Sequence, residues 1–241
     1  MKINGTDIKD FGAKQWRVEF GQMNLKNDSE WVRGSPLPYF AVNDVGFKEI
    51  IVTLMVYGAG REAIRNRISS ITALLLEPAA LDLDGYTHKF MGVLEKSTVK
   101  EHTDSSRERF QSVELQFAGY EYAKEAVTQV SGQTEIVMTN PGNLVSPAAI
   151  ELTPQIGISE LRITGLCRDS VNGEDLPVTV KNLTTGETVL LDGIEGFIRK
   201  GNAVTADIDI WALPTLLPGK NTITLSSSRT EAKLRVLPLF K

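Results

Sequence analysis

The sequence predicts a mainly β protein of two domains, and three observations lead to that prediction. Apolar residues alternate with polar ones over much of the chain, which is the spacing of half-buried strands. A single segment, residues 61–76, instead places its apolar side chains at helical spacing. In the second half, turn dipeptides recur roughly every eight to twelve residues, a pattern typical of a β-sandwich.

Composition narrows the function classes. The 241 residues are 41% hydrophobic and 23% charged, as in a globular protein that buries a core. The formal net charge of -4 argues against a protein that grips nucleic acid through a basic surface, although a mildly acidic wall would let DNA slide past. Neither a signal peptide nor an apolar run long enough to span a membrane is apparent, so we expect synthesis in the cytoplasm.

The first predicted domain covers residues 1–126. Residues 48–57 (KEIIVTLMVY) are apolar on both pleat faces, so we expect a central strand covered on both sides. The helix of residues 61–76 follows, stopped by Pro78 and packed on the sheet. Asp84-Gly85 predicts a hairpin turn, and the polar residues 97–107 predict the tip of a long hairpin.

Residues 23–40 predict an arm that leaves the sheet. The segment is polar but carries Trp31, Tyr39 and Phe40, and large aromatic side chains seek burial. An ordinary surface loop is the alternative. On the helix, Arg61 and Arg65 lie outside the apolar stripe, where they form either a solvated face or a subunit contact. These five residues are the candidates for an oligomer interface.

The second predicted domain covers residues 134–241, after a short polar linker at residues 124–133. Asn172-Gly173, Thr185-Gly186 and Pro218-Gly219 separate short β segments, and no helical stripe occurs there. The expected architecture is a compact all-β sandwich. Cys167, the only cysteine, excludes an intramolecular disulfide and is expected to be a small buried strand residue.

No catalytic, cofactor-binding or metal-binding residue can be named, so the sequence predicts a protein that is not an enzyme. The two histidines, His88 and His102, lie in different parts of a hairpin, and no nucleophile elbow, zinc motif or P-loop occurs. Asp207 and Asp209 alternate with inward-facing isoleucines and are interpreted as outward-facing acids. A pair of carboxylates acting on glycosidic bonds is left open.

The order of these segments resembles the distal tail protein (Dit) family of siphophages. In the first half the resemblance rests on EIIVTLMVY, the helix REAIRNRISSITALLL, LDLDGYTHKF and VELQFAGYEY. In the second half it rests on NPGNLVSPAAIEL and the late turn LPGKNTI. The resemblance implies an N-terminal tail-tube-like β-sandwich domain with one helix and long arms, followed by a C-terminal galectin-like β-sandwich.

The resemblance also implies a role in the phage particle. It suggests a hexameric ring at the tail tip that joins the tail tube to the baseplate or tail fibre and lets DNA pass through a central channel. The galectin-like domain would then be a docking site for receptor-binding or other baseplate proteins. The expected partners are further copies of the chain, the tail tube protein and the tail-associated protein, with no membrane and no cofactor.

A carbohydrate-binding or adhesion module is the main alternative. Such a module would stack sugars on exposed aromatic side chains of the second domain. Trp211 is the only tryptophan there, and because it follows the alternating residues 208–210 we expect it in the core.

Overall fold

The computed structural model describes residues 1–21, 25–26, 29–30, 36, 39–40, 44–100, 110–169, 173–201 and 207–241. These residues group into two compact units, Met1–Glu121 with Lys241 and Tyr122–Phe240. Strands dominate both units, and α1 (Arg61–Ala73) is the α-helix found among the described residues. The mainly β fold class is therefore confirmed.

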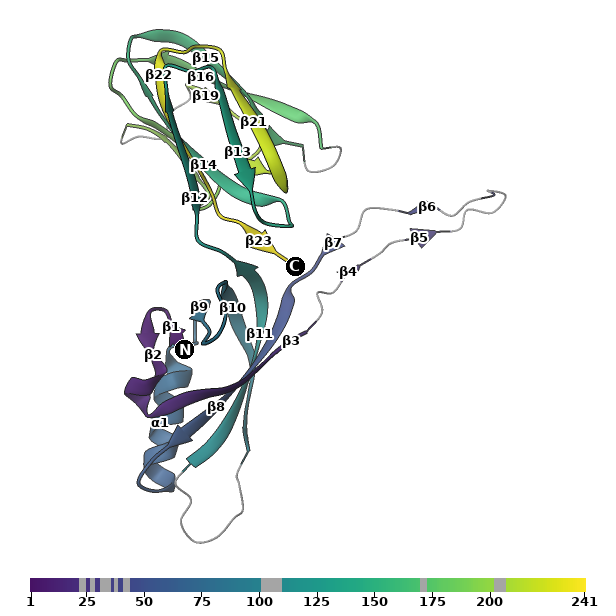
Figure 1. Ribbon diagram of the computed structural model, residues 1–241, viewed down its shortest axis with the longest axis vertical. Coiled ribbons are helices and arrows are strands. Elements are labelled where there is room, and N and C mark those ends of the chain that lie inside the picture. Colours follow the sequence, from purple (N-terminus) through teal and green to yellow (C-terminus); the bar gives the residue numbers. More distant parts are fainter. Residues whose placement is uncertain are drawn as a thin grey trace. The chain divides into compact units, whose positions relative to one another are not determined.

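The first unit is built on a sheet with the strand order β2-β1-β9-β10-β11-β8-β3, and α1 lies against one face of it (Figure 1). Its elements in chain order are β1 (Lys2–Ile3), β2 (Thr6–Asp7), the 3-10 helix η1 (Ile8–Phe11), β3 (Ala13–Phe20), β4 (Leu25–Lys26), β5 (Ser29–Glu30), β6 (Tyr39–Phe40), β7 (Asp44–Val45), β8 (Lys48–Tyr57), α1, β9 (Ala79–Asp82), β10 (Lys89–Lys100) and β11 (Phe110–Tyr122).

Strand β8 has the bounds that the sequence predicts and pairs antiparallel with both β3 and β11. Ile50, Val52 and Leu54 point to the helix side and are fully buried. The alternate residues, among them Thr53 and Met55, are only partly buried. The expectation that both faces of this strand are covered is therefore wrong. The second face of β8 does carry apolar residues, but helix α1 packs on the opposite face of the sheet.

Helix α1 is shorter than the predicted 61–76. Its apolar stripe behaves as expected, because Ile64 and Ile71 are buried against the sheet. The helix ends at Ala73, where the next two N–H groups donate to carbonyls three residues back and tighten the last turn. This turn buries Leu75 and leaves Leu76 82% exposed, so the chain leaves the helix before Pro78 is reached.

The two hairpin predictions have different outcomes. The turn at Asp84-Gly85 is present between β9 and β10, with Gly85 at a φ of 88°, which favours glycine. The predicted tip at residues 97–107 begins too early, because β10 continues to Lys100. Residues 101–109 lie outside the described part of the chain.

The second unit contains two sheets, consistent with a β-sandwich. The first has the order β12-β22-β14-β17-β18 with β20 beside β14, and the second has the order β13-β21-β15-β16-β19. Its strands are β12 (Ala126–Ser131), β13 (Glu135–Asn140), β14 (Ser146–Pro154), β15 (Ile158–Arg168), β16 (Asp175–Leu183), β17 (Val189–Asp192), β18 (Phe197–Lys200), β19 (Ile208–Asp209), β20 (Thr215–Leu216), β21 (Gly219–Leu225), β22 (Thr230–Val236) and β23 (Leu239–Phe240).

The linker expected at residues 124–133 is wrong. Ala126–Ser131 form β12, whose residues pair in unbroken register with β22. Ala126 and Val130 pack on the sandwich core, so this polar segment is an edge strand with one face turned inward. Polar residues at alternate positions are what an edge strand of a sandwich requires, and they gave the segment its linker-like composition.

A buried carboxylate fixes one corner of the sandwich. The Asp192 side chain is 2% exposed, and its Oδ1 accepts the backbone N–H groups of Ile194 and Glu195 at 2.8 and 2.9 Å. Its Oδ2 accepts a hydrogen bond from Arg235 Nη2 at 3.0 Å. Every oxygen of this carboxylate thus has a charged or backbone donor, which is the condition for burying it at low cost.

Two glycines allow β10 and β11 to approach closely. A Cβ atom on Gly119 would overlap the carbonyl oxygen of Met91 and the Cα of Gly92. A Cβ atom on Gly92 would meet Phe90 and the carbonyl oxygen of Ala118. Because three of these four neighbours are backbone atoms, they cannot move aside as a flexible side chain would. Glycine is therefore required here for space between strands.

We predict that Gly119→Ala lowers the free energy of unfolding of the first unit by about 2 kcal/mol, the usual cost of overpacking a filled site. Urea unfolding of the wild type and the variant measures the difference. Gly60→Ala is the matched control in the same unit, because no atom lies within 4 Å of the Cβ that it would add. Equal stability of Gly119→Ala and the wild type would contradict the prediction.

Candidate functional site: the open sheet face and the arm base

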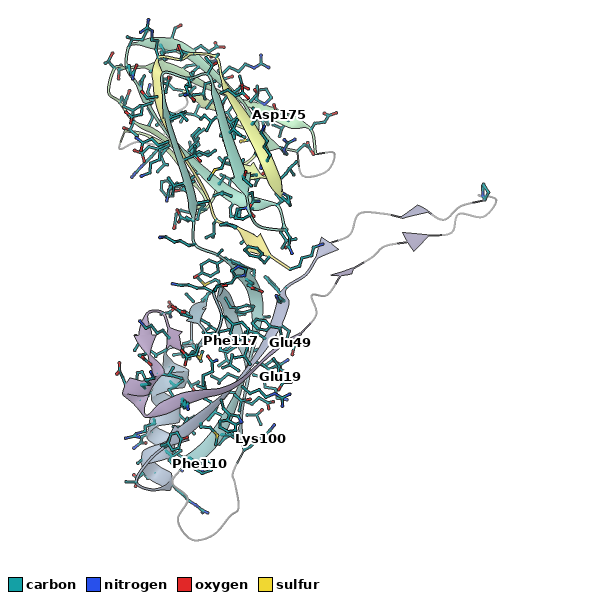
Figure 2. All side chains as sticks on the ribbon, in the orientation of Figure 1. Glu19, Glu49, Lys100, Phe110, Phe117 and Asp175 are labelled. Carbon is teal, nitrogen blue, oxygen red and sulfur yellow. The ribbon has the colours of Figure 1, made fainter. Side chains whose placement is uncertain are left out.

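The face of the first sheet opposite α1 is only partly covered. Antiparallel pairing places Arg17, Thr53 and Glu114 in one row across β3, β8 and β11. The next row joins Glu19 and Ile51 to the β11 residue Gln116. We call this surface the open face, and Figure 2 shows Glu19, Glu49 and Lys100 along it.

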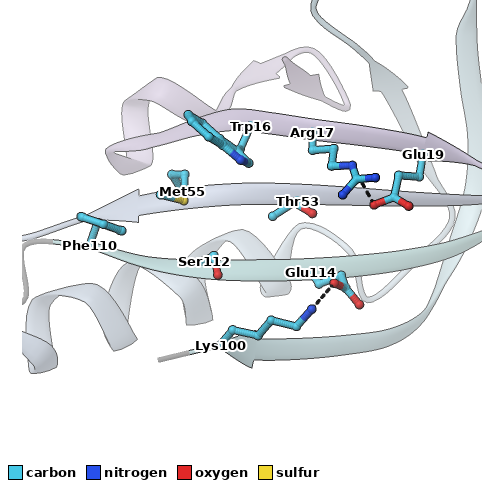
Figure 3. Close-up of a pocket in the computed structure, with 9 residues that line it drawn as sticks. All are labelled: Trp16, Arg17, Glu19, Thr53, Met55, Lys100, Phe110, Ser112 and Glu114. Carbon is cyan, nitrogen blue, oxygen red and sulfur yellow. Dashed lines mark hydrogen bonds and ion pairs between the residues drawn. The ribbon is translucent and has the colours of Figure 1, made fainter. Parts of the chain in front are cut away.

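A bulge adds an aromatic side chain to the open face. The register of β3 against β8 shifts between Gln15 and Arg17, which leaves Trp16 as the extra residue. Bulges of this kind turn a side chain in a new direction. Trp16 is 67% exposed and lies over the sheet beside Met55 (Figure 3). A large apolar side chain is thus presented to whatever faces the sheet.

The open face encloses a hollow of about 550 Å³, lined by Trp16, Arg17, Glu19, Thr53, Met55, Lys100, Phe110, Ser112 and Glu114. The cations of this lining each have a carboxylate partner. Arg17 Nε lies 3.0 Å from Glu19 Oε1, and Lys100 Nζ lies 2.6 Å from Glu114 Oε2 (Figure 3). The lining therefore carries no net charge, since its positive and negative side chains are equal in number and paired.

The predicted arm corresponds to the chain between β3 and β8. Within it, β4 pairs with β7 and β5 pairs with β6, so the described pairs form a hairpin. Trp31 lies outside the described residues. Tyr39 and Phe40 form β6, opposite Glu30 and Ser29, while their side chains lie outside the described part. The interface role of these three aromatics stays a prediction.

The two arginines singled out on the helix are both on exposed positions of α1. Arg61 begins the helix and Arg65 follows one turn later, so both side chains face away from the core. Arg67, by contrast, binds within the unit. Its Nη1 donates to the Tyr57 carbonyl oxygen at 2.6 Å. Arg61 and Arg65 therefore lie on the helix surface, whereas Arg67 binds the end of β8.

A buried charge cluster at the base of the arm was not found by sequence reasoning. The ammonium of Lys48, the first residue of β8, forms an ion pair with Glu121 Oε2 and donates to the Lys241 carbonyl oxygen at 3.0 Å. The other carboxylate oxygen of Glu121 lies 2.7 Å from His88 Nδ1. The side chains of Lys48 and Glu121 are only 11% and 18% exposed. We call Lys48, His88 and Glu121 the base cluster.

The electrostatics of the base cluster favour the charged form of Glu121. Burial acts to raise the pKa of this carboxyl group, but the hydrogen bonds from Lys48 and His88 outweigh burial. The pKa of Glu121 therefore lies below its ordinary value of 4.5. The only signals in the sequence were a lysine at the start of an apolar strand and a glutamate at the end of another, and neither reveals the pairing.

Aromatic rings extend the base cluster to the other end of the arm. The ammonium of Lys48 lies 5.0 Å from the ring centroid of Phe20, the last residue of β3. Tyr86 packs edge to face on the same ring, with the centroids 5.1 Å apart. Where the chain leaves the sheet, the Gly21 N–H donates to the Glu49 carbonyl oxygen at 3.0 Å. Both ends of the arm are thus held at one place.

In the second unit, the expected core position of Trp211 is wrong. The side chain is 81% exposed. Ile208, Ile210 and Ala212 pack on the sandwich core, so the alternation turns residue 211 outward. The alternation of residues 208–212 already indicated an outward side chain at position 211. The expectation failed because it weighed the apolar character of tryptophan above the parity of its position.

Among the described residues, no group of three or more His, Cys, Asp or Glu side chains is arranged to hold a metal ion. Cys167 is buried on β15, as expected, and burial together with Asp175 raises the pKa of its thiol to about 12. No helix in the described ranges has the length and apolarity needed to cross a membrane.

We predict that replacing Glu121 with Gln destabilises the first unit in a pH-dependent way. Because the folded pKa of Glu121 is depressed, its contribution is complete above the ordinary value of 4.5 and is lost as pH falls through the folded pKa. The variant should cost about 2 kcal/mol near neutral pH, since it leaves Lys48 without its carboxylate. Unfolding of both proteins between acid and neutral pH measures this. A difference independent of pH would contradict the assignment.

Solved structures of phage proteins share this architecture. No protein-family model and no curated protein matches the chain. Among solved structures, the chain is similar to the crystal structure of the SPP1 Dit protein, described as a paradigm of the hub adsorption apparatus of phages that infect Gram-positive bacteria. The TM-score is 0.74 at 16% identity, over 99% of this chain and 98% of that one.

Two baseplate structures of phage p2 in its activated conformation are also similar. The strontium-containing structure aligns with a TM-score of 0.51 at 10% identity, over 95% of this chain and 92% of that chain. The calcium-containing structure aligns with a TM-score of 0.52 at 9% identity, over 96% and 92%. The resemblance to the distal tail proteins of siphophages is thus confirmed at the level of the fold, over nearly the whole chain.

Proposed function

We propose that this protein is a structural component of a bacteriophage tail tip, made in the cytoplasm of the bacterial host and incorporated into the virion. In this proposal, copies of the chain form a ring. The resemblance to the distal tail family suggests that the ring is a hexamer. The ring joins the tail tube to the baseplate or tail fibre. The likeness to hub and baseplate proteins over nearly the whole chain supports this role.

The observation that carries the proposal is the open face. The strands of this sheet pair antiparallel, and an antiparallel sheet can pack one face on the core while the other face stays in water. A sheet face without a helix over it therefore suits a surface that remains in contact with solvent in the assembled ring. We assign the open face to the wall of the central channel. The pairing of the two cations that line the hollow suits this assignment, because a paired cation offers passing DNA a weaker counterion-releasing contact than an unpaired one.

Contacts between subunits are assigned to the arm of residues 23–40, to the segment 97–107 that the sequence predicts as a hairpin tip, and to α1. Trp31, Tyr39, Phe40, Arg61 and Arg65 are the proposed interface residues. Aromatic and arginine side chains carry a disproportionate share of the binding energy in protein interfaces. The galectin-like second unit is assigned to the docking of receptor-binding or other baseplate proteins.

Negative-stain microscopy and light scattering of the purified protein, alone and with tail partners, test ring formation. We expect rings with a central hole, and Trp31→Ala should raise the protein concentration needed for ring closure by about tenfold or more, the effect of losing a hot spot. Trp211→Ala is the matched control and should close rings as the wild type does. A monomer that stays single at high concentration with its partners present would refute the proposal.

A second test addresses the channel. At low salt, the wild-type protein should show no tight binding to duplex DNA. Glu114→Lys should create salt-sensitive affinity, because the variant adds a cation to the open face and frees Lys100 from its partner. Glu160→Lys adds the same charge at an exposed position of β15 and is the control. Tight, salt-sensitive binding by the wild type would contradict the assignment of this face to the channel.

Binding of carbohydrate by the second unit is the other candidate function, and the exposure of Trp211 favours it. An exposed indole ring is a suitable surface for stacking a sugar ring. If this candidate is correct, a glycan array probed with the full chain should give signals that Trp211→Ala abolishes and Trp16→Ala retains. An array without signals would leave Trp211 to protein docking.

A further inference from the structure

Strand β12 forms one edge of the first sheet of the second unit. Within the described residues it pairs with β22 alone, in unbroken antiparallel register, with Ala126 opposite Val236. On the other side of β22, the Leu237 N–H donates to the Pro147 carbonyl oxygen of β14. Because the backbone groups of a strand point alternately to its two sides, Val236 and every second residue before it bond toward β12.

The backbone groups of β12 that point away from the sheet belong to Val127, Gln129 and Ser131. Their partners in the register are the residues of β22 that bond toward β14. The backbone N–H and C=O groups of these three residues therefore make no hydrogen bond within the described part of the chain. Six extended residues give an edge about 20 Å long. Such a row of donors and acceptors matches the backbone of another extended strand.

The edge strands β2, β3, β18 and β19 carry features that discourage pairing with another chain. Strand β3 contains a bulge and the charged residues Lys14, Arg17 and Glu19. Strand β18 has four residues and ends in Arg199 and Lys200, while β2 and β19 have two residues each. Bulges, charges and short length are the usual means of protecting a sheet edge. Strand β12 (AVTQVS) has six residues without a charge, a proline or a bulge.

The core beneath β12 is incompletely covered. Ala126 and Val130 pack on the sandwich core but stay partly exposed. On β13, the edge strand of the second sheet, the inward residues Ile136 and Met138 are 0% and 3% exposed. A strand added to β12 would place its own inward side chains beside Ala126 and Val130 and bury apolar surface there. A strand added to β13 would bury much less.

We propose that β12 is a docking edge to which a partner protein adds an extended antiparallel strand. On the core side this strand presents β-branched apolar residues to Ala126 and Val130. On the outer side it presents uncharged polar residues beside Gln129 and Ser131. The backbone hydrogen bonds supply affinity, and the alternate side chains supply specificity. The inference deepens the proposed function and rests on it for the partner being a baseplate protein that docks on the second unit.

A labelled peptide of alternating valine and threonine, with a lysine at each end, tests the edge on the full chain. The valine nitrogens are methylated, which prevents the peptide from pairing with itself through its far edge. We expect saturable binding by fluorescence anisotropy and, by NMR, slower hydrogen exchange of the Val127, Gln129 and Ser131 amides. Methylation of the threonine nitrogens instead removes the donors that face β12 and should weaken binding at least about tenfold.

Variants of the chain supply the second readout. Gln129→Pro removes an outward donor while leaving the bonds to β22 in place, and should bind the peptide at least about tenfold more weakly. Val137→Pro on β13 is the matched control and should bind as the wild type does. The Leu225 N–H donates to the Thr134 carbonyl oxygen, so alternation turns the N–H of residue 137 outward too. Val127→Lys, which adds a charge at a 54% exposed edge position, should also weaken binding if the proline disturbs folding.

The outcomes separate the docking edge from the ring, because the peptide binds to a single subunit. Binding at β12 by a protein that forms no rings would retain the docking edge and refute the ring. Rings formed by a protein that does not bind the peptide would overturn the docking edge alone. Equal weakening by Gln129→Pro and Val137→Pro, or slower exchange confined to amides outside β12, would also overturn it.

Discussion

A sheet has two faces, and the first unit of this protein has one helix to cover them. This constraint matters most for strand β8, because its apolar side chains point to both faces of the sheet. On the helix side the packing is complete, with Ile50, Val52 and Leu54 inaccessible to water. On the other side, Thr53 and Met55 are partly buried and Trp16 lies beside Met55.

The open face carries polar and charged side chains as well as apolar ones. Glu114 and Lys100 neutralise one another, and Gln116 donates to Glu49 at 2.7 Å. Such a face tolerates water, unlike a hydrophobic core cut in half, but it offers no unpaired cation among its lining residues. This mixed surface is the observation from which the proposal that the open face lines a channel is argued.

Much of the fold follows from local pattern, and the failures are instructive. The bounds of β8 and the buried stripe of Ile64 and Ile71 were predictable because periodicity is a local property. The true end of α1 depended on Leu75 being needed in the core, which no stop signal records. The polar segment 126–131 looked like a linker because an edge strand and a linker share a composition.

The candidate site was less predictable than the fold. Trp16 was visible in the sequence, but its direction depends on a bulge that only the pairing of β3 with β8 reveals. The base cluster joins Lys48 and Glu121, which are 73 positions apart in the chain. Spacing within a single strand carries no information about such a partner. Trp211 is the exception, since the parity of its neighbours already indicated an outward side chain.

The burial of Cys167 has a consequence for the life of an assembled particle. A phage structure leaves the reducing interior of its host at lysis and then persists in oxidising surroundings, where exposed thiols of adjacent copies can join covalently. A thiol whose pKa is raised to about 12 inside a sandwich core holds almost no thiolate with which to react. With that as its only cysteine, a chain that works in a virion, as proposed, would pass from one redox environment to the other without forming disulfides.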